Sequence, residues 1–251
     1  MSDPASSSAL PAAGASTALR PSASLERLGP KERTATPHER EEDQPQPTKP
    51  TQQQLNKVCD EWAGNIKVVL FGEDQIQRKV REMAQEISRD YAGRKVLCVG
   101  LLTGCFVFLA DLLRQFLVPY EVDFMVVSSY GHSTSTSGSV KLKKDMSIDP
   151  RGRDVLIIED LIDTGTTLEW IVAHLKTKGC ASVRLACLLD KASRRKANVH
   201  VDYVGFTCPD EFVVGYGMDF ADQYRCLPFV GVLAPHAYGA SEPVTQTNNS
   251  A

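Results

Sequence analysis

Long apolar runs are missing from this chain of 251 residues. No stretch approaches the roughly 18 consecutive apolar residues that a membrane-spanning helix requires, so we expect no membrane partner. An excess of positive charge is also missing, because the formal net charge is -3. A nucleic-acid-binding domain usually carries a broad basic surface, so we expect no nucleic-acid partner either.

Several short motifs are absent as well. The chain has no G-x-x-x-x-G-K-[ST], which excludes a Walker-type NTPase, and no G-x-G-x-x-G follows a strand, which counts against a dinucleotide dehydrogenase. It contains 7 cysteines but no C-x-x-C pair. Because Cys98, Cys105 and Cys187 lie within apolar segments, we expect buried free thiols and a reducing compartment.

Large apolar residues are scarce at the N-terminus. Residues 2–50 contain no Val, Ile, Phe, Tyr or Trp, and eight of the 14 prolines fall among the first fifty residues. Such a segment cannot bury enough apolar surface to offset the entropy of ordering it. We therefore predict a disordered tail over 1–58, a folded domain over 59–238 and a second tail over 239–251. The Ser, Ala and Arg content of the first tail is similar to that of an organellar transit peptide, but the acidic residues at 39–43 favour a cytoplasmic protein.

Between the tails, apolar strand-like segments alternate with helical patterns. Ile76, Val80, Met83 and Ile87 recur at helical spacing. This alternation, with strands that are apolar throughout, predicts an α/β domain with a central parallel sheet flanked by helices. The other expected elements are strands at 96–102, 121–130, 154–160 and 182–190, helices at 105–117 and 168–179, and short strands at 201–208, 212–216 and 229–233.

The stretch VLIIEDLIDTGTTL at 155–168 ends an apolar strand in three acids and a small hydroxyl-rich loop. Ligands of open α/β sheets bind at the carboxyl ends of strands. Gly165 permits a tight turn, and the helix expected next offers free N–H groups and a positive dipole to a phosphate. Glu159 and Asp160 are then placed for hydroxyl groups or Mg²⁺. Ordinary helix capping is the alternative, but three acids beside this loop favour a functional site.

The same stretch resembles the phosphoribosyl-pyrophosphate (PRPP) binding motif of type I phosphoribosyltransferases. Four further segments resemble those of the hypoxanthine-guanine phosphoribosyltransferases, in unbroken order between Val68 and Tyr238. They are LLTGCFVFLADL at 101–112 (pyrophosphate loop), SSYGHSTSTSG at 128–138 (mobile loop), CLLDKASRRK at 187–196 (strand with the purine-binding lysine) and FVVGYGMDFADQYR at 212–225 (purine site).

The resemblance implies the type I phosphoribosyltransferase fold, with a small hood subdomain mainly from 198–238 and a contribution from the chain before Phe71. It implies transfer of the phosphoribosyl group of PRPP to N9 of hypoxanthine or guanine, with Mg²⁺ as cofactor. The implied PRPP-binding residues are Thr103, Gly104, Ser129, Tyr130, Glu159, Asp160, Leu161, Ile162, Asp163, Thr164, Gly165, Thr166, Thr167 and Arg225. The implied purine-binding residues are Lys191, Phe212, Val213 and Asp219, and the implied metal ligands are Glu159, Asp160 and Asp219.

Elementary chemistry supports several of these roles. A carboxylate at Asp163 can take the purine N7 proton as a general base. Lys191 only donates hydrogen bonds, so it can read the 6-oxygen of the purine but not an amino group. Phe212 offers a flat face for stacking, and Arg225 can fork onto pyrophosphate. Without the family, a core phenylalanine, a solvated lysine and a surface salt bridge are the alternatives for Phe212, Lys191 and Arg225.

Four points stay open on the sequence alone. Thr103 stands where many relatives have lysine, in a loop for which the family implies a cis peptide. Residues 129–147 are expected to form a lid that excludes water, or else a plain surface hairpin. The resemblance implies a homodimer or homotetramer, and the alternative function is a PRPP-sensing regulator of the same fold that binds nucleic acid or a partner protein.

Overall fold

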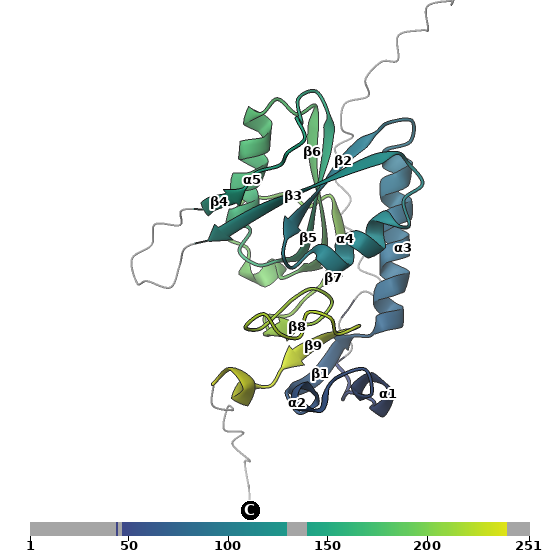
Figure 1. Ribbon diagram of the computed structural model, residues 1–251, viewed down its shortest axis with the longest axis vertical. Coiled ribbons are helices and arrows are strands. Elements are labelled where there is room, and N and C mark those ends of the chain that lie inside the picture. The colour runs from purple at the N-terminus through teal and green to yellow at the C-terminus, as the bar shows by residue number, and fades with distance from the viewer. Residues whose placement is uncertain (1–43, 45–46, 130–139, 240–251) are drawn as a thin grey trace, which may run out of the picture. The chain divides into compact units, whose positions relative to one another are not determined.

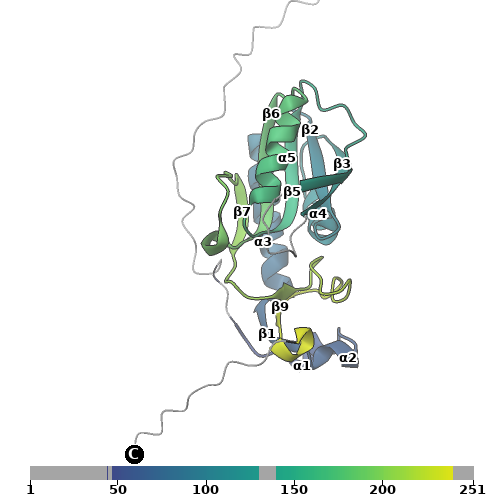
Figure 2. The same ribbon diagram turned by 90° about the vertical axis from the view of Figure 1, so that its left-hand side faces the viewer.

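A six-stranded sheet forms the centre of the domain, with strand order β4-β3-β2-β5-β6-β7 (Figures 1 and 2). The computed structural model describes residue 44, residues 47–129 and residues 140–239, all within one compact unit spanning 39–251. Neighbouring strands pair in parallel from β3 to β7, and β4 pairs antiparallel with β3 at the edge. The strands are β2 (Val96–Leu102), β3 (Tyr120–Ser129), β4 (Val140–Lys144), β5 (Asp154–Ile162), β6 (Ser182–Asp190) and β7 (Tyr203–Thr207).

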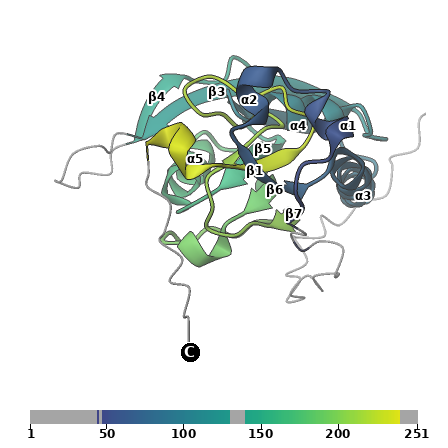
Figure 3. The same cartoon turned by 90° about the horizontal axis from the view of Figure 1, so that it is seen from below.

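Helices cover both faces of this sheet, as predicted. Helices α3 (Glu73–Asp90) and α4 (Phe106–Leu113) lie on one face, and α5 (Thr166–Thr177) lies on the other (Figures 1 and 3). Alternate residues of each strand point to opposite faces. Accordingly, Leu156 and Ile158 of β5 belong to the cluster under α3 and α4, whereas Val155 and Ile157 belong to the cluster under α5.

Helix α3 illustrates how the sequence dictates these contacts. Ile76, Val80, Met83 and Ile87 recur on one side of the helix and are all buried. Each buried side chain of this kind stabilises the fold by roughly 2 kcal/mol relative to an exposed one. The acidic side chains in the first turn of α3 complement the helix dipole.

A second, three-stranded sheet with order β1-β9-β8 forms the hood. It consists of β1 (Ile66–Phe71), β8 (Val213–Val214) and β9 (Val230–Leu233), beside α1 (Gln52–Leu55), α2 (Asp60–Ala63) and the short helix η3 (Pro235–Tyr238). It lies toward the end of the central sheet at which the parallel strands finish (Figures 1 and 2).

The hood differs from the expectation at two boundaries. β7, expected in the hood, pairs in parallel with β6 and belongs to the central sheet. Residues 47–58, assigned to the tail, are ordered instead: Thr48 exchanges two backbone hydrogen bonds with Val69, and Val58 is buried. These residues were misassigned because they contain few apolar side chains, and Val58 becomes buried only through a cluster with distant residues such as Ile66 and Leu233. Residues 1–43, 45–46 and 240–251 of the predicted tails lie outside the described residues.

Two further observations bear on the composition. The buried free thiols expected at Cys98, Cys105 and Cys187 are confirmed, and burial raises the pKa of Cys98 to about 12. None of the helices in the described ranges has the length and apolar character that a membrane span requires.

Strand β4 was not predicted, because its lysine-rich sequence has little of the apolar character of a strand.

Candidate active site

Three adjacent strand ends bring the candidate residues together. β5 lies between β2 and β6, and all three run parallel. Their last residues Leu102, Ile162 and Asp190 therefore lie at the same edge of the sheet. This arrangement places Thr103, Asp163 and Lys191, the residues that follow, in neighbouring loops.

Two acidic side chains in the last part of β5 have raised pKa values. The Oε2 atom of Glu159 is fully enclosed and has no hydrogen-bond partner among the described residues. Burial raises the pKa of Glu159 well above its ordinary value, and the neighbouring Asp160 raises it further. Burial likewise raises the pKa of Asp160 to about 6, although backbone hydrogen bonds and Arg225 act in the opposite direction. Ligands that supply hydroxyl donors or a cation would favour the ionised form of both groups.

The loop after β5 has the geometry of an anion site. Gly165, with φ 80°, is the N-cap of α5, and no side chain caps the first N–H groups of that helix. The hydroxyls of Thr164 and Thr166 lie 3.3 Å apart. Uncapped N–H groups, hydroxyl donors and the positive end of the helix dipole all favour a phosphate here.

Leu161 and Ile162 lie within β5 rather than in the loop. Ile162 is buried in the cluster under α5, and its carbonyl accepts a hydrogen bond from the Lys191 N–H at 2.9 Å. Leu161 packs against the cluster on the other face. Any contact of Ile162 with a ligand would therefore involve its backbone.

The loop after β2 approaches the acidic strand end very closely. The peptide bond between Leu102 and Thr103 is cis, in the loop for which a cis bond was expected. A Cβ atom on Gly104 would lie 2.1 Å from Oδ2 of Asp160, and a Cβ atom on Gly217 would lie 2.0 Å from the Gly104 carbonyl oxygen. Three segments far apart in sequence thus meet at Gly104.

Arg225 and Asp219 lie beside this meeting point. Nη1 of Arg225 lies 2.9 Å from Oδ1 of Asp219 and donates to the Gly217 carbonyl at 3.0 Å. Nη2 of Arg225 donates to Asp222 at 2.9 Å, and Asp219 Oδ2 accepts from the Asp222 N–H at 2.8 Å. The expected pyrophosphate-binding arginine and the expected metal ligand are therefore held together.

The expected purine residues are also brought together. Lys191 is 8% exposed and donates from Nζ to the Glu211 carbonyl at 2.7 Å, directly beside Phe212. Phe212 is 41% exposed, so it is not a core residue. The centroid of its ring lies 5.3 Å from that of the Tyr238 ring, and the two rings are stacked. Val213 is buried in β8, which leaves its backbone as the part able to contact a ligand.

The chain is similar to known proteins over this whole region. The family model for the phosphoribosyl transferase domain matches residues 72–221. The chain belongs to the phosphoribosyl transferase family. A hypoxanthine-guanine phosphoribosyltransferase of Bacillus subtilis (strain 168) is 47% identical over 174 residues, which are 69% of this chain and 97% of that protein. A crystal structure of a hypoxanthine phosphoribosyltransferase from Staphylococcus aureus superimposes with a TM-score of 0.69 at 41% identity, covering 72% of this chain and 98% of that one.

Some relatives in this phosphoribosyl transferase family are much longer. A bifunctional TilS/HprT protein of Listeria monocytogenes serotype 4b (strain F2365) is 48% identical over 174 residues, and the match covers 69% of this chain. It covers 27% of that protein, so the chain spans about a quarter of the length of this relative. The family and the fold predicted from the sequence are confirmed.

The acidic residues suit the magnesium ion that the family implies. Among the described residues, no three metal-ligating side chains gather as a cage. Mg²⁺ commonly binds through one or two carboxylates and completes its shell with substrate phosphates and water. The unpartnered Oε2 atom of Glu159 and the neighbouring Asp160 carboxylate are oxygen donors of this kind.

Only part of the expected lid, residues 129–147, lies within the described residues. Ser129 is the last residue of β3 and pairs in register with Val140 of β4. Tyr130 and residues 131–139 lie outside the described residues. The structure therefore places Ser129 and residues 140–147 of the expected lid, but not Tyr130.

Sequence reasoning missed two arginines around the Asp163 loop. Arg194 binds Asp163 and Asp210, with Nε 2.5 Å from Asp163 Oδ1 and Nη1 3.2 Å from Asp210 Oδ2. Arg195 pairs with Asp190 and packs against Gly165. The signal was the basic run RRK after Lys191, but basic runs usually lie on solvated surfaces, and the contacts of this one depend on tertiary structure.

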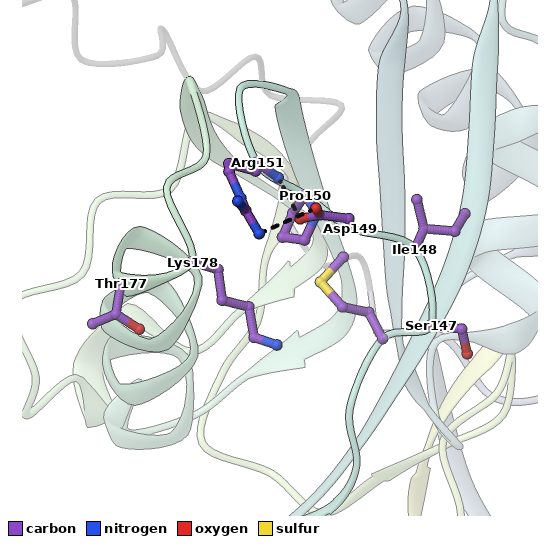
Figure 4. Close-up of a pocket in the computed structure, with 8 residues that line it drawn as sticks. Ser147, Ile148, Asp149, Pro150, Arg151, Thr177 and Lys178 are labelled. Carbon is purple, nitrogen blue, oxygen red and sulfur yellow. Dashed lines mark hydrogen bonds and ion pairs between the residues drawn. The ribbon is translucent and has the colours of Figure 1, made fainter.

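A surface hollow of about 420 Å³ lies elsewhere, between the 146–151 segment and the end of α5 (Figure 4). It is at the opposite end of β5 from Asp163, because α5 runs back along the sheet. Its charged side chains are already paired, Arg151 with Asp149 and Lys178 with Asp145. We therefore assign it no part in the site.

Proposed function

We propose that this chain is a purine-salvage enzyme that transfers the phosphoribosyl group of PRPP to N9 of hypoxanthine or guanine and releases pyrophosphate. The observation that supports this most is the placement of a phosphate loop, a buried acidic pair and Lys191 on neighbouring strand ends. These groups match the three parts of the reaction: a phosphate, a ribose and a 6-oxopurine.

The purine would bind between the loop after β6 and the hood. Phe212 presents an exposed ring for stacking, and Lys191 keeps free donors after bonding the Glu211 carbonyl. Because an ammonium group cannot accept a hydrogen bond, Lys191 favours a 6-oxo group over the 6-amino group of adenine. The backbone of Val213 would bind the remaining edge of the base.

Asp163 would act on the base during bond formation. As N9 forms its bond to C1 of the ribose, the bond from C1 to the pyrophosphate oxygen breaks and the purine loses its N7 proton. A carboxylate within hydrogen-bond reach of N7 accepts or stabilises that proton. Asp163 follows β5 directly, and Arg194 holds its Oδ1 atom, which leaves Oδ2 for the purine.

The leaving pyrophosphate would lie where the backbone of Thr103 and Gly104 meets Arg225. The guanidinium of Arg225 and the backbone N–H groups of the loop would stabilise its charge. Mg²⁺, held through Glu159, Asp160 or Asp219 together with substrate oxygens, would neutralise charge on the departing pyrophosphate. Asp219 would reach the ion through the pyrophosphate side.

The phosphoribosyl part of PRPP would bind along the end of β5. Glu159 and Asp160 would accept hydrogen bonds from the 2′- and 3′-hydroxyls of the ribose, which suits their buried carboxylates. The Thr164–Thr167 loop would bind the 5′-phosphate through N–H and hydroxyl groups. Ser129 and Tyr130 would belong to the lid over the site.

We also propose a cytoplasmic enzyme that forms a homodimer or homotetramer. Leu117 is 82% exposed and Tyr120 is 38% exposed beside α4, which gives such an assembly apolar contacts. Sedimentation analysis of the purified chain tests the assembly.

The alternative is a PRPP-sensing regulator of the same fold, which would bind nucleic acid or a partner protein. A regulator could dispense with the purine residues, yet Lys191, Phe212 and Arg225 are present and adjacent to the acidic loop. Incubation with PRPP, Mg²⁺ and hypoxanthine, followed by chromatography, tests the enzyme directly. Formation of inosine monophosphate with equimolar pyrophosphate is expected, and binding of PRPP without product would favour the regulator.

A further inference from the structure

The expected phosphate loop lacks a cation of its own. Residues 159–167 contain three acids and no Lys or Arg. The 5′-phosphate of PRPP or of a nucleotide is a dianion, so binding it here would bring like charges together. Helix-dipole and N–H contacts offset only part of this repulsion.

Arg195 packs against the loop at Gly165, whereas Arg194 already binds Asp163. A Cβ atom on Gly165 would lie 3.0 Å from Cδ and 3.2 Å from Nη1 of Arg195. The guanidinium therefore packs directly against the loop backbone at Gly165. Lys196 and Ala197 fix this position, because their N–H groups donate to the Thr164 carbonyl at 2.9 and 3.0 Å.

The guanidinium of Arg195 is only partly satisfied. Its Nη2 atom donates to Asp190, while Nε and Nη1 are fully enclosed and have no hydrogen-bond partner among the described residues. Buried donors without acceptors cost free energy, so a second role for this charge is needed to explain its place. The neighbouring Arg194 is different, since it is half-exposed and already binds Asp163 and Asp210.

We propose that Arg195 is a binding residue for the 5′-phosphate, supplying from behind Gly165 the positive charge that the Asp163–Thr167 loop lacks. Asp190 orients the guanidinium and partly neutralises it. This inference rests on the proposed function, because it assumes that the loop takes the 5′-phosphate of a purine nucleotide.

The test compares guanosine monophosphate with guanosine by calorimetry, since the two ligands differ only in the phosphate. The ratio of their Kd values cancels contributions from the base and the ribose. Arg195→Met keeps the packing but removes the charge. It is expected to reduce the preference for the monophosphate about tenfold, because the phosphate loses its attraction to one partly screened positive charge. Arg195→Lys is expected to keep most of the preference.

Asp190→Asn separates a charge effect from a purely structural one. If Arg195 acts on the phosphate, removing its countercharge strengthens or preserves the preference for the monophosphate. If the Asp190–Arg195 pair only stabilises the fold, Asp190→Asn weakens that preference as Arg195→Met does, and the proposal is wrong.

Thermal unfolding without ligand shows whether each variant is folded. If Arg195→Met does not fold, Arg195→Lys and Asp190→Asn still test whether Arg195 binds the phosphate. An unchanged preference in a folded Arg195→Met overturns the inference alone. A wild-type protein that binds both ligands equally overturns the proposed function and the inference together.

Discussion

Arg194 joins Asp163 to the purine-binding segment: its Nε atom lies 2.5 Å from Asp163 Oδ1, and its Nη1 atom contacts both carboxylate oxygens of Asp210. Asp210 stands two residues before Phe212. One side chain therefore connects the loop after β5 with the segment expected to stack on the purine.

Removing this connection should slow the reaction more than it weakens PRPP binding. We expect Arg194→Ala to lower kcat by roughly three- to tenfold, because the carboxylate of Asp163 loses its fixed orientation. Arg194→Lys should recover part of the rate. Arg151→Ala is the matched control, since Arg151 also forms an exposed ion pair but lies at the other end of β5. Equal kcat values in the two alanine variants would contradict the positioning role.

Substitution of Asp163 tests the general base itself. We expect Asp163→Asn to lower kcat by about a hundredfold or more, because an amide cannot accept the N7 proton in the same way. Its circular dichroism spectrum should match that of the wild type, since the Asp163 side chain is half-exposed. Near-normal turnover would remove Asp163 from this role.

Lys191 should act on the base alone. Lys191→Ala is expected to raise the KM for hypoxanthine at least tenfold, since a donor to the 6-oxygen would be worth about 1.5–3 kcal/mol, and to leave the KM for PRPP nearly unchanged. Lys178→Ala, which removes a lysine paired with Asp145 away from the site, is the control. Equal increases in both KM values would show that Lys191 supports the whole site instead of reading the base.

The pH dependence of stability should reveal the buried acid at Asp160. Its pKa is raised to about 6 in the folded protein, so the native state binds the proton more tightly than the unfolded chain does. Ligand-free stability from this group is therefore present at low pH and lost as the pH rises from about 4 through 6.

Asp160→Asn removes this ionisation. The variant should be more stable than the wild type at pH 7–8, by up to about 3 kcal/mol, and the difference should shrink toward pH 4. Denaturant unfolding of both proteins across this range measures it, with the exposed carboxylate variant Asp149→Asn as control. A stability difference that does not change with pH would contradict the assignment.

Truncation tests where the ordered domain begins. Deleting residues 1–46 should leave activity and Tm unchanged. Deleting residues 1–58 should destabilise the hood by roughly 2–4 kcal/mol, the combined worth of two hydrogen bonds and one buried valine. Those contacts are the Thr48 pairing with Val69 and the burial of Val58. A chain lacking 1–58 with the Tm of the full protein would show that the predicted boundary was right after all.

The sequence predicted the elements whose chemistry is local. The apolar strand at 154–160 and the helical spacing of α3 follow from side-chain periodicity, and both lie where they were expected. The acidic loop was predicted because its residues are contiguous. Its place beside the ends of β2 and β6 follows only once these strands pair in parallel with β5, because parallel neighbours finish at one edge of the sheet.

The elements that sequence reasoning missed depend on contacts between distant segments. The Arg194 connection spans 31 residues to Asp163, and nothing in the run RRK shows which carboxylates it meets. Strand β4 is stabilised as an edge by pairing with β3, and β7 lies in the central sheet because it pairs with β6. Tertiary pairing outweighs composition in each case.

Initial rates with PRPP and Mg²⁺ against hypoxanthine, guanine, xanthine and adenine in turn test the proposed enzyme most directly. We expect turnover of hypoxanthine and guanine and none of adenine, because Lys191 beside Phe212 can donate to a 6-oxygen but cannot accept from a 6-amino group. Turnover of adenine at a similar rate would contradict the purine assignment. If no base is turned over although PRPP binds measurably, the chain is not the proposed enzyme, and its phosphate loop would belong to a sensor.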